Sequence, residues 1–246
     1  TISRVIDPTT ATGSGPSTTL NNGSVLSNGM VTTGLDLYLD ASNSRSYSGS
    51  GNTWFDLSGN GRNATAVGSP TYDSANGAFN FNGTSQYFDL GNTGFNYQGT
   101  QTYTMATWVK TTNPSKSEQC MICRYTDASP NYGSFLWRLG NGSPTMYRMA
   151  TWYSSGAAAL NSSNYYYLVT SYDGTNANFF INGVRVSSTA AGSLLFQAGV
   201  STYIGATPSS TAPRYFQGQI GAVQLIVQEQ QQAFAQGACL LRSLVQ

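Results

Sequence analysis

The stretch from Tyr165 to Val186 limits most strongly what this chain can fold into. It reads as three β-strands joined by two turns. Its first strand, residues 165–172, alternates tyrosine, aliphatic and hydroxyl side chains between two faces, which suits a pleated, half-buried surface. An Asp-Gly pair at 173–174 predicts the first turn. An Asn-Gly pair at 182–183 predicts a tight hairpin, because both central residues of such a turn need positive φ. The stretch therefore predicts a three-stranded antiparallel unit.

Similar short strands, separated by turn signals, recur along the chain. Many short strands of this kind favour an antiparallel sandwich. At 246 residues the chain is long enough to form one such domain around one core. The further strands are predicted at 34–41, 77–88 (with an Asn-Gly turn inside), 103–110, 135–139, 146–152, 202–205 and 215–225.

The order of these motifs resembles that of laminin-G-like domains in the concanavalin A-like lectin/glucanase superfamily. The resemblance rests on the loop WFDLSGNG at 54–61, the strand ending in WVK at 108–110, the Tyr-Asp-Gly hairpin and the closing FQGQI at 216–220. It extends in order over roughly residues 34–225. It implies an all-β fold, a two-sheet antiparallel jelly-roll sandwich, of the type found in phage virion and surface-adhesion proteins.

The two ends of the chain differ from this central part. Residues 1–33 form an arm rich in Ser, Thr, Gly and Asn that lacks aromatic residues and cannot bury enough apolar surface to fold alone. We expect the arm to be extended and held by its own sandwich or by another protein chain. Residues 34–227 are predicted to form the sandwich. Residues 228–246 form a tail in which Phe234, Ala238 and Leu241 have helical spacing, which predicts a short C-terminal helix.

Composition argues against several classes of function. Charged residues make up 9% of the chain and the net charge is +1, so no basic patch is predicted to attract nucleic acid. No apolar run approaches the roughly 18 residues of a membrane span. The absence of histidine excludes a Ser-His-Asp triad. The two glutamates, Glu118 and Glu229, are isolated, whereas a retaining glycosidase needs two adjacent carboxylates. We therefore predict that the protein is not an enzyme.

Three residues are candidate metal ligands. Asp56 and Asn60 resemble the start of a calcium-binding loop, but Val67 occupies the twelfth position, where a bidentate glutamate is expected. Asp173 is the most plausible further loop carboxylate. Asp and Asn also stabilise tight turns by accepting hydrogen bonds from backbone amides, and we favour this interpretation. No cofactor is therefore predicted, and calcium binding is left open.

The chain contains three cysteines, Cys120, Cys123 and Cys239. The Cys-x-x-Cys spacing is typical of metal and redox sites, yet the pair lies in a predicted strand and no histidine accompanies it. We interpret Cys120 and Cys123 as small buried hydrophobic residues.

Four residues are candidates for carbohydrate binding, since sugar sites combine aromatic rings with a few polar groups. Trp137 alternates with apolar neighbours, so it is predicted to be buried and to leave Arg138 on the opposite face. Arg148 and Trp152 are predicted to share a face because their spacing is even. Tyr153 follows directly.

Two hypotheses of function follow. The first is a non-catalytic virion protein, a capsid decoration or surface fibre component, anchored to capsid or sister chains through its arm and located on the virion surface. The alternative is a carbohydrate-binding adhesion module of a secreted or cell-surface protein, with or without calcium. In both, the partners are protein chains or surface glycans rather than nucleic acid or membrane.

Overall fold

A computed structural model describes residues 18–19, 25–26, 34–127, 133–148, 151–193, 198–208 and 211–227 of the protein. Every regular element in these ranges is a β-strand. Within them, no helix has the length and apolar character needed to cross a membrane. The predicted C-terminal helix at 228–246 lies outside the described residues, and so does the predicted arm, apart from a small antiparallel ladder of β1 (Thr18–Thr19) and β2 (Val25–Leu26).

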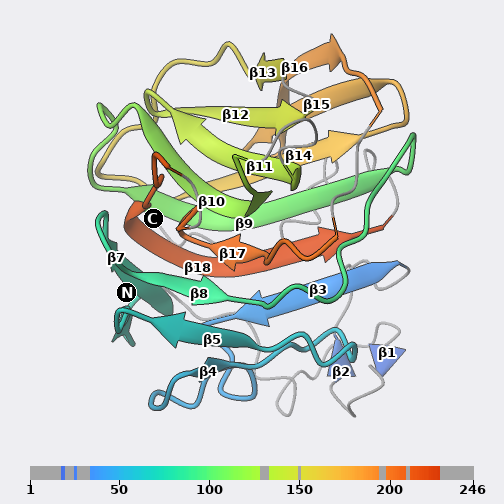
Figure 1. The fold of residues 1–246 in the computed structure, drawn as a ribbon. Coiled ribbons are helices and arrows are strands. Elements are labelled where there is room, and N and C mark those ends of the chain that lie inside the picture. The colour runs from blue at the N-terminus through green and yellow to red at the C-terminus, as the bar shows by residue number, and fades with distance from the viewer. Residues whose placement is uncertain are drawn as a thin grey trace.

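Two antiparallel sheets form a sandwich (Figure 1), which confirms the predicted fold class. Sheet 1 has the order β13 (Thr151–Ser154), β12 (Ser143–Arg148), β11 (Gly133–Gly140), β10 (Glu118–Tyr125), β17 (Tyr203–Ile204), β8 (Tyr87–Asp89), β5 (Ala64–Val67) and β4 (Thr53–Trp54). Sheet 2 has the order β16 (Val184–Ala190), β15 (Asn176–Ile181), β14 (Tyr166–Tyr172), β9 (Tyr103–Thr111), β18 (Gln217–Ile226), β7 (Ala78–Asn82) and β6 (Thr71–Asp73). The remaining strand, β3 (Leu35–Asp40), pairs with the last part of β18.

The unit predicted from Tyr165 to Val186 is confirmed as β14, β15 and β16. Asn182 and Gly183 have φ values of 51° and 83°, as the predicted hairpin turn requires. Both faces of β14 are buried: Leu168 points into the main core, while Tyr167 joins a second apolar cluster on the outer face of sheet 2.

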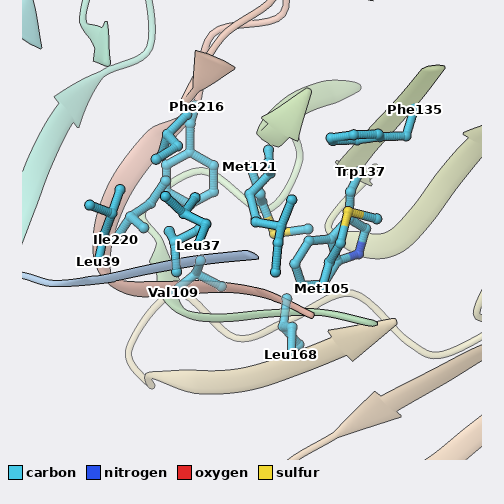
Figure 2. Packing of buried hydrophobic residues seen from close by; sticks show 14 of the residues in the cluster. Leu37, Leu39, Met105, Val109, Met121, Phe135, Trp137, Leu168, Phe216 and Ile220 are labelled. Atoms are coloured by element: carbon cyan, nitrogen blue, oxygen red, sulfur yellow. The ribbon is translucent and has the colours of Figure 1, made fainter. Parts of the chain in front are cut away.

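The main core lies between the two sheets (Figure 2). Sheet 1 contributes Met121, Phe135 and Trp137, and sheet 2 contributes Val109 and Leu168. Because Trp137 is fully buried, alternation along β11 turns Arg138 to the outer face of sheet 1, as predicted.

Two features of the sheets depart from a regular alternation of inward-pointing and outward-pointing side chains. The predicted strand 146–152 is divided into β12 and β13, which pair with each other. Separately, a register shift between β3 and β18 places Leu35 in the outer cluster of sheet 2, while Leu37 and Leu39 enter the main core. A shift of one residue moves a side chain to the other face of a sheet, so even spacing along the sequence did not determine these positions.

Candidate functional site

A group of aromatic and charged side chains lies on the outer face of sheet 1. Residues opposite each other on neighbouring strands share a face, and Tyr147 of β12 is the register partner of Trp152 of β13. Arg138 lies on this same face, next to them on β11. We call the group the aromatic–arginine cluster; its members are Glu118, Tyr125, Arg138, Tyr147, Trp152 and Arg214.

Ion pairs and ring contacts hold the cluster together. The carboxylate of Glu118 pairs with both Arg138 and Arg214. The guanidinium carbon of Arg138 lies 3.6 Å from the ring centre of Trp152, and that of Arg214 lies 5.0 Å from the ring centre of Tyr125. Each arginine is thus held between a carboxylate and an aromatic ring.

The aromatic rings also contact one another. The ring centres of Tyr147 and Trp152 are 4.5 Å apart, and those of Tyr125 and Tyr147 are 5.7 Å apart. Tyr125 is buried, Tyr147 is half-buried, and Trp152 is 41% exposed. The cluster therefore presents one large apolar ring to solvent beside buried, fixed hydrogen-bond donors.

Burial and charge pairing shift the pKa values in the cluster. Burial by itself would raise the pKa of Glu118, but the hydrogen bonds and charges of Arg138 and Arg214 outweigh it and hold that pKa below its ordinary value. Burial lowers the pKa of Arg138, and the pairing with Glu118 opposes this change. Burial also raises the pKa of Tyr125 to about 12, and a hydrogen bond with Asp127 adds to the effect. The tyrosine is therefore neutral at physiological pH, while the Glu118 carboxylate is charged.

A disulfide between Cys120 and Cys123 lies beneath the cluster. Both cysteines are fully buried, as predicted, and they pack with Tyr125 and Tyr147, but the interpretation as simple hydrophobic residues was wrong because they are bonded to each other. In a regular strand, residues three apart point to opposite faces. A register shift at Met121 adds one residue to β10, and this bulge brings both cysteines to the outer face.

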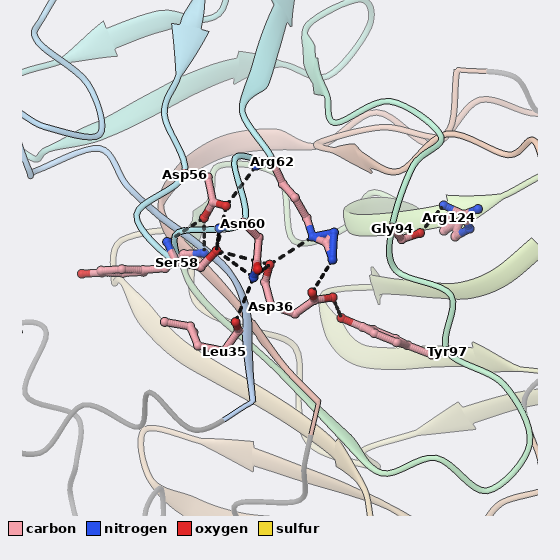
Figure 3. A network of polar contacts seen from close by, with 10 residues as sticks. Leu35, Asp36, Asp56, Ser58, Asn60, Arg62, Gly94, Tyr97 and Arg124 are labelled. Atoms are coloured by element: carbon pink, nitrogen blue, oxygen red, sulfur yellow. Dashed lines mark hydrogen bonds and ion pairs between the residues drawn. The ribbon is translucent and has the colours of Figure 1, made fainter. Parts of the chain in front are cut away.

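The candidate metal ligands Asp56 and Asn60 lie in a different polar network, at the start of β3 (Figure 3). The Asp56 carboxylate accepts hydrogen bonds from the backbone amides of Tyr38, Ser58 and Arg62 and from the Ser58 hydroxyl. The side-chain amide of Asn60 donates to the carbonyl oxygens at positions 35 and 36. These contacts fasten the loop 55–63 to β3, which is the turn-stabilising role favoured from the sequence.

Charged groups continue this network into the end of the core. Arg62 forms an ion pair with Asp36 at 2.6 Å, and the Tyr97 hydroxyl donates to the same carboxylate at 2.7 Å (Figure 3). Burial is the main reason why the pKa of Tyr97 is raised, and the charge of Asp36 adds to it. Nearby, the fully buried Arg124 donates to the carbonyl oxygen of Gly94.

The third candidate metal ligand, Asp173, stabilises the turn between β14 and β15. Its carboxylate accepts hydrogen bonds from the backbone amides of Thr175 and Asn176 and from the side-chain amides of Asn176 and Asn178. Within the ranges that the structure describes, no three His, Cys, Asp or Glu residues gather into a metal-binding group. Calcium binding at Asp56, Asn60 or Asp173 stays a prediction.

Comparison with a known family decides the classification of the fold. A family profile described as "Concanavalin A-like lectin/glucanases superfamily" matches residues 82–229. The chain belongs to this superfamily. The matched region contains β8–β18 and all the residues of the aromatic–arginine cluster. A comparison with curated protein sequences found no match.

Several solved structures share the sandwich. Domain 4 of AbnA, a GH43 extracellular arabinanase from Geobacillus stearothermophilus, in complex with arabinotriose, is 19% identical with a TM-score of 0.62, over 83% of this chain and 98% of that one. The Trypanosoma rangeli sialidase in complex with sialic acid is 14% identical with a TM-score of 0.59, over 85% of this chain and 33% of that one. The receptor binding domain of botulinum neurotoxin C/D mosaic serotype is 12% identical with a TM-score of 0.59, over 85% of this chain and 51% of that one. This chain thus spans about a third of the sialidase, and at these identities the likeness shows the fold alone.

The superfamily sandwich brings only some of the predicted sugar-binding residues together. Arg138 and Trp152 meet in the cluster. Tyr153 packs against the main core, and its hydroxyl accepts a hydrogen bond from the amide of Gly192. Arg148 is the register partner of Thr151, whereas Trp152 is the register partner of Tyr147. The even-spacing argument for a shared face was wrong because it assumed one continuous strand, and the two residues belong to separate strands that pair with each other. The side chain of Arg148 lies outside the described residues.

Only two of the six members of the cluster, Arg138 and Trp152, are among the four residues predicted from the sequence to bind a sugar. Glu118 was noted as an isolated carboxylate, and Tyr125 was not singled out. Arg214 lies 96 residues from Glu118 in the sequence. No local pattern brings residues so far apart into contact. The described residues 211–216 lie beside β10, where the Cys120 amide donates a hydrogen bond to the Arg214 carbonyl oxygen.

Proposed function

We propose that the chain is a non-catalytic carbohydrate-binding module and that the aromatic–arginine cluster holds the sugar. The observation that carries this proposal is the exposed ring of Trp152, packed against Arg138 and Tyr147. Small-ligand sites combine aromatic surface with a few well-placed polar groups, and a sugar offers apolar C–H faces together with hydroxyls. The Trp152 ring would cover the apolar face, while the guanidinium and carboxylate groups would bond the hydroxyls.

The fold and its neighbours support a sugar ligand. The superfamily is described by its lectins and glucanases, and the arabinanase domain and the sialidase have structures with arabinotriose and sialic acid.

The pairing of Glu118 supports binding without catalysis. A glycosidase general acid needs a raised pKa, whereas the two arginines lower that of Glu118. Incubation with labelled polysaccharides should leave them intact, and the appearance of shorter products would overturn this part of the proposal.

Tryptophan fluorescence gives a direct test of sugar binding. Of the four tryptophans, Trp54, Trp108 and Trp137 are buried, and only Trp152 is exposed. A bound sugar should therefore shift the emission and protect it from iodide quenching, and Trp152→Phe should abolish both changes. Val184→Ser, which alters an exposed apolar residue on β16 of the other sheet, is the matched control and should respond like the unaltered protein. A glycan array that stays blank with and without calcium would refute the proposal.

A location outside the reducing cytosol is part of the same proposal. Disulfides such as Cys120–Cys123 persist on secreted proteins and on cell or virion surfaces. A more specific part of the proposal is that the protein is displayed on a virion through contacts of residues 1–33 with other protein chains. This part rests on the composition of that segment. Chemical cross-linking of the intact assembly should link residues 1–33 to a neighbouring chain. A full-length protein that sediments as a monomer and forms only internal cross-links would contradict it.

A further inference from the structure

The outer face of sheet 1 continues beyond the aromatic–arginine cluster. Cys123 of β10 has Leu136 as its register partner on one side and Tyr203 of β17 on the other, and Tyr203 in turn faces Asp89 of β8. Leu136 is also the register partner of Tyr147 of β12, and Tyr147 is the register partner of Trp152 of β13. A single row of cross-strand partners therefore connects Trp152 to Asp89 across sheet 1. Its central member, Cys123, is fully buried and packs with Tyr125 and Tyr147 of the cluster.

A second group of aromatic rings stands at the far end of this row. The ring centres of Tyr87 and Tyr203 are 5.6 Å apart, and those of Tyr87 and Tyr215 are 6.4 Å apart. Their neighbours in the chain, Phe88, Ile204 and Phe216, are buried in the core, so the three tyrosines point outward and are each half-buried. We call Tyr87, Tyr203 and Tyr215 the tyrosine platform.

The length of the row from Trp152 to Asp89 indicates the size of the ligand. The row crosses six strands, from β13 to β8. Strands lie about 4.8 Å apart, so the row is about 24 Å long. A single sugar covers one end of such a row, whereas a chain of several sugar units covers both.

The charges along the row indicate the ligand's class. In the part of the chain that the structure describes, the two arginines of the cluster are accompanied by the carboxylates of Glu118 and Asp127. At the tyrosine platform, Lys116 donates to the Tyr215 carbonyl oxygen, and Asp89 lies beside Tyr203. Positive and negative groups therefore balance at both ends, which favours a neutral ligand over an anionic one.

We propose that the aromatic–arginine cluster and the tyrosine platform form one continuous binding face for an extended, neutral oligosaccharide chain. This inference rests on the proposed function and adds the length and charge of the ligand. The Trp152 and Tyr203 rings are the two contacts on which the extended chain depends.

The test compares short and long sugars of one type. The probes are arabinobiose and arabinohexaose, with di- and hexasaccharides from xylan and cellulose beside them, measured by calorimetry. The hexasaccharide of the type that binds should bind more tightly than its disaccharide. Tyr203→Ala and Trp152→Ala should each weaken hexasaccharide binding about tenfold, the effect of losing one important interface ring. At most one of the two variants should weaken disaccharide binding.

Controls separate the loss of a ring from the loss of the fold. Tyr203→Phe keeps the ring, so it should retain more of the hexasaccharide affinity than Tyr203→Ala does. Tyr87→Ala removes a different ring of the platform and should repeat the effect of Tyr203→Ala. Thermal unfolding of each variant shows that it is folded. Val184→Ser should change neither the hexasaccharide affinity nor the disaccharide affinity.

The outcomes distinguish this inference from the proposed function. If the hexasaccharide binds no more tightly than the disaccharide and Tyr203→Ala has no effect, the extended face is wrong while a sugar site at Trp152 stands. If an oligogalacturonate of the same length binds more tightly than the neutral hexasaccharide, the assigned ligand class is wrong. If none of these sugars binds the unaltered protein, the proposed function fails and this inference fails with it.

Discussion

Replacing Asp56 by alanine should destabilise the protein strongly, although Asp56 lies outside the aromatic–arginine cluster. Its buried carboxylate accepts hydrogen bonds from the amides of Tyr38, Ser58 and Arg62, at 2.9–3.0 Å. The amides of Tyr38 and Ser58 belong to buried residues, and alanine leaves both without this acceptor. An unsatisfied buried donor costs about 1–3 kcal/mol, so we expect a loss of about 3 kcal/mol in the free energy of unfolding.

Asp56→Asn is the matched comparison. The asparagine carbonyl oxygen takes the place of the oxygen that bonds the Tyr38 and Ser58 amides, while its NH₂ group cannot accept from the Arg62 amide. We expect a loss of about 1–2 kcal/mol for this variant, because it leaves fewer donors unsatisfied. Arg45→Gln, at an exposed position nearby, should change stability very little.

The assay is thermal unfolding in calcium and in EDTA. For a chain of this length, 1 kcal/mol corresponds to about 2–4 °C, so Asp56→Ala should lower the melting temperature by about 6–12 °C in both buffers. If EDTA lowers the melting temperature of the unaltered protein as much as the substitution does, Asp56 acts as a metal ligand and the reasoning from backbone hydrogen bonds is wrong.

Three further predictions concern other parts of the sandwich. Cys120→Ala with Cys123→Ala should lower stability by about 2 kcal/mol in urea unfolding, as expected for closing a very short loop, and full alkylation of both thiols without a reductant would contradict the disulfide. The pKa of Glu118 lies below its ordinary value of 4.5, so its ion pairs stabilise the fold at neutral pH and this contribution is lost as the pH falls through the lowered pKa. The stability difference from Glu118→Gln should therefore be constant above about pH 5 and shrink in acid, and a difference independent of pH would argue against the pairing. Gly218→Ala should destabilise the protein severely, since φ is +142° and a Cβ would overlap the Lys110 carbonyl oxygen; unchanged urea unfolding would show that β18 and β9 adjust there.

Local physical chemistry made much of the sandwich predictable. The Asn-Gly pair at 182–183 determines a hairpin because of its backbone preference, and alternation along β11 correctly separated the buried Trp137 from the outward Arg138. These inferences involve only residues that are neighbours in the sequence. For such residues, the alternation of side chains along a strand is enough to predict which face each one occupies.

Alternation failed where the backbone departs from a regular strand. The bulge at Met121 brought Cys120 and Cys123 to the same face, and the antiparallel pairing of β12 with β13 placed Trp152 opposite Tyr147. Neither departure has a marker in the sequence as clear as an Asn-Gly pair, because the register of a strand depends on what its partners bury.

The sequence by itself therefore determined the strands, most turns and the superfamily, through short-range periodicity and motif order. Tertiary structure alone decided which side chains form the candidate site. Glu118, Arg138 and Arg214 come from β10, β11 and a distant loop, and they meet because strand pairing places those segments side by side. Such contacts depend on the closure of long loops around a shared core, and no local pattern encodes that closure.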